Sequence, residues 1–266
     1  MGAKIPNAMP DGERYTEILF PEYYEDIFTE ADLDFRFRLI RSHIHPKLRV
    51  LVTGCLETVS EVYETDPYTF SKLAREPRTH DGDAERLRCA LYGLRPNEVR
   101  GSGFPNLRSS SGRGRHVADF DLSFFADRDG LGLELHVGRQ EELALLEQVY
   151  TDHRAQVDAL LTFVRLGVDG PSESRLLSLQ GMLAAAKGAG EGWLAVFEPR
   201  YPFPIAARDF MARFEDCFLA LYLIYDAMLC RALGIEDHFK AHFEKLEKHY
   251  QQSAQIDDEP PPPSFA

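Results

Sequence analysis

The sequence predicts an α+β fold in which a small antiparallel sheet, built on one central hairpin, is packed by several helices. Three observations lead to this prediction. Residues 115–137 alternate apolar and polar side chains over two short runs joined by the turn sequence ADRDG. Residues 143–164 repeat apolar side chains at spacings of three and four. Residues 205–233 form a long helix-length segment that stops at Gly234, which predicts a helical C-terminal region.

The N-terminal part predicts helices followed by a long loop. PEYYEDIF and DLDFRFRLIRSHI each have a helical pattern, and we expect the second helix to break near Pro46. One apolar stripe joins Leu33, Phe37, Ile40 and Ile44. LRVLVTGCLETVSEVYE fits either a helix or a strand that leads into one. Residues 76–115 are rich in Arg, Gly, Pro, Asn and Ser and predict mostly loop, with a short helix over residues 84–92.

The remaining elements are predominantly helical. A continuous helix of about six turns should carry the stripe Leu143, Leu146, Tyr150, His153, Val157, Leu160 and Val164. Ser172 is the expected N-cap of the next helix, WLAVFEP reads as a short strand, and EDHFKAHFEKLEKHY as a last amphipathic helix.

These elements suggest an α+β domain over residues 14–169 and a mainly helical region over residues 170–252. The same pattern also allows residues 170–252 to complete the first domain's core. The proline-rich tail, residues 253–266, is expected to be disordered.

Charge is distributed unevenly along the chain. The net charge is −13, which argues against broad binding to duplex DNA or to an anionic membrane, since both are polyanions. Residues 72–115 nevertheless hold ten Lys and Arg against five Asp and Glu. This local basic segment predicts that the protein can still hold a single anion.

The cysteines and the hydropathy pattern predict a soluble, cytoplasmic protein. Cys55, Cys89, Cys217 and Cys230 have no metal-ligand spacing and are expected to be reduced core residues. No hydrophobic signal segment opens the chain. The apolar run of residues 217–230 is interrupted by Asp226 and is too short to cross a bilayer. Asp226 should therefore be hydrogen-bonded to an Arg or Tyr in the core, or line a cavity.

Two stretches resemble the YktB-like family. FPEYYEDIFTEADLDFRFRLIRSHIHPKL is similar to that family's aromatic-rich helix with its Arg, Ile and Pro-Lys run, and RGRHVADFDLSFFADRDGLGLELHV to its Arg-Gly segment and following strands. The resemblance covers about residues 19–165, departs from the family pattern over residues 74–112, and has no counterpart for residues 170–266. It implies an α+β domain with an antiparallel sheet. The family has no established activity, so no catalytic residue is transferred.

One face of the hairpin gathers groups that could form a catalytic site. If Arg128 and Asp129 form the turn, paired residues have numbers that sum to 257, which places Asp121 opposite His136 and Ser123 opposite Glu134. A register moved by two would place Ser123 opposite His136. The candidate catalytic residues are Asp119, Asp121, Glu134 and His136.

Two interpretations of this face stay open. Carboxylates and an imidazole suit a divalent metal or a general base, and glycines 132 and 138 would let a ligand approach the backbone. The other interpretation is a solvated or helix-covered polar face. A nuclease of the PD-(D/E)xK type would need a lysine where His136 stands.

The arginine-rich segment predicts an anion site. Its candidate anion-binding residues are Arg100, Arg108, Arg113, Arg115 and His116. Guanidinium forks and glycine-rich backbone suit phosphate or carboxylate. The segment matches neither a Walker motif nor a dinucleotide fingerprint. The alternative is that these arginines pair with the acidic remainder of the chain, within a subunit or across a dimer.

Three function classes follow from these features. The first is an anion-binding or interaction protein that uses the arginine segment to bind a phosphate-bearing metabolite or a short nucleic-acid strand. The second is a metal-dependent hydrolase that uses the hairpin face. The third is a structural or oligomerising subunit that associates through helix 205–233, either with a second copy of itself as a homodimer or with another protein. The sequence assigns no cofactor and no metal.

Overall fold

The computed structural model describes residues 20–64, 78–79, 86–91, 120–170, 178–188, 194–205, 208–232 and 234–257. Within these residues the strands form one antiparallel sheet in the order β1-β2-β3-β4-β6-β5. Its strands are β1 (Arg78–Thr79), β2 (Arg86–Leu91), β3 (Asp121–Asp127), β4 (Gly130–Val137), β5 (Gly167–Asp169) and β6 (Leu194–Tyr201). The α+β class and the antiparallel sheet built on the central hairpin are thereby confirmed.

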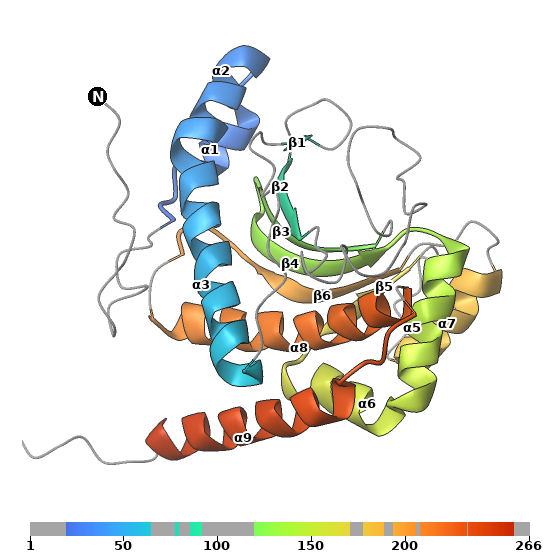
Figure 1. Ribbon diagram of the computed structural model, residues 1–266. Coiled ribbons are helices and arrows are strands. Elements are labelled where there is room, and N and C mark those ends of the chain that lie inside the picture. The colour runs from blue at the N-terminus through green and yellow to red at the C-terminus, as the bar shows by residue number, and fades with distance from the viewer. Residues whose placement is uncertain are drawn as a thin grey trace, which may run out of the picture.

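The helices pack around the sheet and around one another (Figure 1). They are α1 (Tyr24–Thr29), α2 (Leu33–Leu39), the π-helical turn η1 (Ile40–Ile44), α3 (His45–Tyr63), α5 (Gln140–Asp152), α6 (Arg154–Phe163), α7 (Leu179–Gly188), α8 (Arg208–Ala232) and α9 (Phe239–Asp257). In Figure 1, α8 lies beneath the sheet and α9 lies beneath α8. None of the described helices is long and apolar enough to cross a membrane.

Helix α8 forms the centre of the core. Every side chain from Cys217 to Cys230 is buried, because α8 packs against β3 and β4 on one side and against α3, α5 and α9 on the others. Phe124 of β3, for example, contacts the rings of Phe214 and Phe218. The apolar side chains from Cys217 to Cys230 are therefore used within the chain, whereas the side chains of residues 206–212 and 233, which belong to the predicted oligomerising helix 205–233, lie outside the described ones.

The end of α8 follows the expected glycine stop. Gly234 has a φ of +66°, in the left-handed region that favours glycine. Its N–H donates to the Arg231 carbonyl, and the Ile235 N–H donates to the Cys230 carbonyl. These two bonds form a Schellman motif, which satisfies carbonyl groups that the helix end would otherwise leave without donors.

The helix predicted to break near Pro46 does not break. Helices α2 and α3 are joined by η1, in which the N–H of His45 donates to the carbonyl of Ile40, five residues earlier. Proline lacks an N–H and its ring crowds the carbonyl four residues before it, so the wider π turn accommodates Pro46 without ending the helix. Of the predicted stripe, Ile40 and Ile44 are buried, whereas Leu33 is 46% exposed.

Two further predictions of secondary structure were wrong. The six-turn helix divides at His153, whose φ of −126° and ψ of 31° separate α5 from α6, although its stripe residues are buried as expected. The backbone of residues 86–91 is strand β2 and not a helix, because it pairs with β3 along its whole length. The predicted strand around residues 194–198 is confirmed as β6.

The C-terminal region shares the sheet of the hairpin. Strand β6 pairs with β4 and also with β5, and α7 and α8 belong to the same buried cluster as α3 and α5. Ser178 rather than Ser172 lies at the start of α7, where its hydroxyl accepts the N–H of Gly181. Ser172 lies outside the described residues.

Candidate functional site on the second face of the sheet

The hairpin has the register expected from its turn. Asp121 pairs with His136 and Ser123 pairs with Glu134, with Arg128 and Asp129 in the turn. The alternative register, moved by two residues, is therefore excluded. Because paired residues share a face, the predicted catalytic positions of β3 and β4 lie on the same side of the sheet.

The two faces of the hairpin differ in what they carry. The core face presents Leu122, Phe124, Leu131, Leu133 and Leu135, all of which are fully buried. We call the opposite side the second face and define it by Ser123, Phe125, Gly132, Glu134 and His136. Ser123 is fully buried and Phe125 is 4% exposed, whereas Glu134 and His136 are half-buried. The second face is thus a partly enclosed polar surface.

The glycines of this region do not leave space for a ligand. A Cβ atom on Gly132 would lie 2.1 Å from the ring of Phe125, and one on Gly167 would lie 2.7 Å from the ring of Phe197. Each glycine therefore accommodates an aromatic ring of a neighbouring strand, which corrects the expectation that Gly132 opens the backbone to a ligand. Gly138, the other glycine of that prediction, is exposed.

The neighbouring strands extend the polar character of the second face. On β2, Ala90 pairs with Ser123, Arg88 with Phe125, and Arg86 with Asp127. Two arginine positions of the basic segment therefore share the face with the hairpin carboxylates. On the other side, Ala195 of β6 pairs with both His136 and Asp169, which adds a further acidic position.

The long connection between β2 and β3 begins and ends at the Asp121–His136 end of the hairpin. Leu91 and Leu122 are paired, so residues 92–119 leave the sheet and return to it on adjacent strands. Arg115 is five residues from Phe120 and can lie no more than about 17 Å from it. The described residues on either side of this connection, Leu91 and Phe120, therefore flank the candidate anion-binding residues in the sequence, and the Leu91–Leu122 pair lies next to the Asp121–His136 pair.

Several predicted site residues lie outside the described residues. They are Asp119, Arg100, Arg108, Arg113, Arg115 and His116. For Asp121 only the backbone position is described. The structure therefore places Asp121, Glu134 and His136 on one face, and fixes the two ends of the segment that carries the other candidates.

The described side chains do not assemble a metal centre. No group of three or more His, Cys, Asp or Glu side chains with a metal-binding arrangement occurs among them. His238 and His242, four residues apart on the chain, have ring centroids 6.0 Å apart, and His238 is exposed while His242 is buried.

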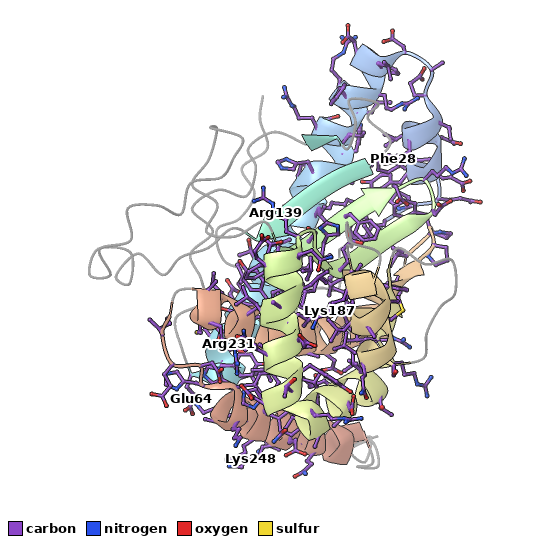
Figure 2. The ribbon with its side chains drawn as sticks, turned by 90° about the vertical axis from the view of Figure 1, so that its right-hand side faces the viewer. Phe28, Glu64, Arg139, Lys187, Arg231 and Lys248 are labelled. Atoms are coloured by element: carbon purple, nitrogen blue, oxygen red, sulfur yellow. The ribbon has the colours of Figure 1, made fainter. Side chains whose placement is uncertain are left out.

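A second cluster of titratable groups, which the sequence did not predict, lies where α5, α6, α8 and α9 meet. Arg231 Nη1 donates to Asp152 at 2.7 Å, and its Nη2 donates to Asp237 at 2.9 Å. His153 Nε2 lies 3.4 Å from both Arg231 Nη2 and Asp237 Oδ1. In Figure 2 the labelled Arg231 lies beside α5. We call Asp152, His153, Arg231 and Asp237 the junction cluster.

Asp226 lies near this cluster, deeper in the core. Its carboxylate is 3.9 Å from His242 Nδ1, so a histidine of α9 lies near it, and its charge also acts on the buried Tyr63. Burial, reinforced by the negative charge of Asp237, raises the pKa of Asp226 to about 7. Burial lowers the pKa of His153, and the positive charge of Arg231 adds to this effect, while Asp237 and Asp152 oppose it.

Comparison of the chain with protein-family models, curated proteins and solved structures found no match. The resemblance to the YktB-like family is accordingly untested by relatives and stays a prediction.

Proposed function

We propose that the protein binds an anion of the phosphate class at the Asp121–His136 end of the second face. The observation that carries this proposal is the antiparallel pairing of β2 with β3: Leu91 pairs with Leu122 beside the Asp121–His136 pair, and the candidate arginines stand in the sequence between these two strands. Arg113 and Arg115 are seven and five residues from Phe120 in the sequence, which lets their guanidinium groups reach this end of the hairpin.

The chemistry of the two sets of residues is complementary. Guanidinium forks make paired, charge-assisted hydrogen bonds to phosphate oxygens. The carboxylates at Asp121 and Glu134 accept hydrogen bonds from hydroxyl or amino groups, and His136 can donate or accept. This combination favours a phosphate-bearing metabolite over bare phosphate, and a short single strand over duplex DNA, because the chain's net charge of −13 repels a long polyanion.

The confirmed register also favours a second candidate function, a metal-dependent hydrolase. Asp121 and His136 are direct neighbours, and Glu134 lies one pair further along β4 on the same face. With Asp119, these residues would supply oxygen and nitrogen ligands to a divalent ion. In a third use of the arginines, they pair with acidic groups of a second copy of the chain or of another protein.

We also place the protein in the cytoplasm. Three cysteines of the described residues, Cys55, Cys217 and Cys230, are buried thiols, which suits a reducing compartment.

The experiment is a thermal-shift and calorimetric titration of the full chain with inorganic phosphate, pyrophosphate, AMP, and ten-nucleotide single and double strands. A ligand at one hundred times its Kd should stabilise the fold by about 2.7 kcal/mol. Loss of two charge-assisted contacts in the double variant Arg113→Ala/Arg115→Ala should weaken binding about tenfold or more. Binding should also weaken as salt is raised.

Arg128→Ala is the matched control. Arg128 is exposed in the turn at the other end of the hairpin, so its removal changes the charge but not the proposed site. Equal weakening by Arg128→Ala would contradict the proposal, as would the absence of any shift. Stabilisation by Mg²⁺, Mn²⁺ or Zn²⁺ after chelation, abolished by Asp121→Asn, would support the hydrolase instead. A salt-sensitive dimer that Arg113→Ala dissociates would support pairing between copies.

A further inference from the structure

The junction cluster connects two parts of the chain that are distant in sequence, residues 152–153 and residues 231–239. His153 lies at the joint between α5 and α6, Arg231 in the last turn of α8, and Asp237 in the connection to α9. The ring of Phe239, the first residue of α9, stacks on the imidazole of His153 with centroids 4.4 Å apart. The cluster therefore fastens the start of α9 to the α5–α6 joint.

His153 Nε2 has two neighbours with opposite requirements. Arg231 Nη2 at 3.4 Å can only donate, so it needs a neutral imidazole whose Nε2 accepts. Asp237 Oδ1, also at 3.4 Å, accepts the Nε2 proton of an imidazolium. Protonation of His153 thus exchanges one partner for the other and places two cations side by side.

The closed arrangement resists protonation of His153. The side chain is only 8% exposed, and its Nδ1 is buried without a hydrogen-bond partner among the described residues. An imidazolium would keep the buried Nδ1–H without an acceptor, would have only Asp237 Oδ1 at 3.4 Å to accept its Nε2–H, and would place a second positive charge next to the guanidinium group. The charged groups that face it are Arg231 from α8, Asp237 from the α8–α9 connection and Asp152 from α5. The positive charge of Lys240 of α9 in turn helps to lower the pKa of Asp152.

We propose that His153 is a proton-operated switch that releases the start of α9 from the α5–α6 joint when it becomes protonated. In the open arrangement water solvates the imidazolium and the ring of His153 leaves Phe239. Arg231 keeps its contacts to Asp152 and Asp237, so the end of α8 stays in place. The opening is therefore confined to the connection and the first turn of α9.

The sign of the pH dependence follows from burial. The closed state lowers the pKa of His153, so the open state binds the proton more readily. Opening is suppressed at neutral pH, where the imidazole is neutral in both states, and grows as the pH falls below the ordinary value of about 6.5. Each unit by which the two pKa values differ can change the opening equilibrium by about tenfold.

The test is hydrogen exchange of the full chain between pH 7 and pH 5, expressed as protection factors corrected for the intrinsic pH dependence of exchange. We expect protection of the amides of residues 235–242 to fall by about tenfold, while that of residues 217–230 is unchanged. In His153→Gln, whose amide stays neutral, protection of residues 235–242 should change by about twofold or less over the same range.

His43→Gln is the matched control, because His43 is exposed on η1 and distant in sequence from the junction cluster. The same pH profile in wild type and His153→Gln would overturn the proposal. It would also be overturned if His43→Gln lost the fall in protection of residues 235–242 at low pH. If His153→Gln does not fold, imidazole titration by NMR on the wild-type chain decides. The midpoint of opening must then coincide with the His153 titration, and a midpoint that follows another histidine contradicts the switch.

Discussion

Asp226 is a carboxyl group placed within the most apolar part of α8. It is 2% exposed, and burial raises its pKa to about 7. The folded state therefore keeps a proton that the unfolded chain releases near pH 4. A carboxylate was recognisable in the sequence as an unusual residue in an apolar run, but its neighbour His242 was not, because the two are brought together only by the packing of α9 on α8.

The pH dependence of stability should reveal this proton. Because the folded pKa lies above the unfolded value, the contribution of Asp226 is complete below about pH 4 and is lost as the pH rises to 7, by about 1.4 kcal/mol per pH unit. Asp226→Asn resembles the protonated acid and cannot titrate. We expect the free energy of unfolding of wild type, measured by urea denaturation, to fall relative to that of Asp226→Asn by about 1.4 kcal/mol per pH unit between pH 5 and pH 7.

Asp129→Asn serves as the comparison for this measurement. Asp129 is an exposed carboxylate in the hairpin turn, and Asp129→Asn keeps Asp226. The free energy of unfolding of Asp129→Asn should therefore fall between pH 5 and pH 7 with the same slope as that of wild type. A wild-type curve that runs parallel to that of Asp226→Asn would show that Asp226 is ionised throughout.

At the scale of elements, local patterns predicted the hairpin and α8 well. The signals that predicted them are the alternation of apolar and polar residues, a two-residue turn and a terminal glycine. Each of these signals depends only on neighbouring residues, so it can be recognised in the sequence without knowledge of the fold. The failure at η1 has a local cause, the wider turn that accommodates Pro46, whereas the failures at His153 and β2 have tertiary causes. Strand β2 forms because it pairs with β3, and the division at His153 coincides with the contacts of that residue to Asp237, Arg231 and Phe239. The β2–β3 pairs join residues more than 30 positions apart, and the contacts of His153 join residues more than 70 positions apart.

The candidate site divides in the same way. The placement of Asp121 and Glu134 on one face followed from the turn, because strand register is a local property. The junction cluster could not be predicted, since His153, Arg231 and Asp237 come from separate elements. The only signal was a histidine within an apolar stripe.

The pairing of β3 with β4 also makes a prediction about Gly132. A methyl group there would lie 2.1 Å from a ring atom of Phe125, which is itself buried. Gly132→Ala should therefore destabilise the fold by about 1–3 kcal/mol, as measured by urea denaturation. Gly188→Ala, at the end of α7 where the added Cβ meets nothing within 4 Å, should be neutral or stabilise the fold by about 0.5–1 kcal/mol. In a Phe125→Ala background the cost at Gly132 should largely disappear, and an unchanged cost would rule out the clash.

At the scale of the whole molecule, the buried cluster runs without interruption from α1 to α9. Strand β4 has β3 on one side and β6 on the other, so the hairpin's sheet continues into the C-terminal region. This continuity predicts that the described residues from Phe20 to Tyr250 unfold as one cooperative unit.

Unfolding should therefore be a single transition by far-UV and near-UV circular dichroism, with coincident midpoints. A fragment ending at residue 169 would expose the β4 edge and the leucines that α8 covers, and we expect it to show no cooperative transition. A fragment of residues 14–169 that melts cooperatively would establish instead the two-part division suggested by the sequence.

The π turn between α2 and α3 has a consequence for how the chain can change during evolution. A turn with hydrogen bonds five residues apart contains one residue more than an α-helical path between the same ends. Deleting that residue would leave α3 packed as before and would rotate α2 by about 100° about the helix axis. Deletion of a single codon would in this way turn the exposed Phe35 to another side of the molecule, and it would also turn Phe37 and Leu39, which now pack against the core, away from it.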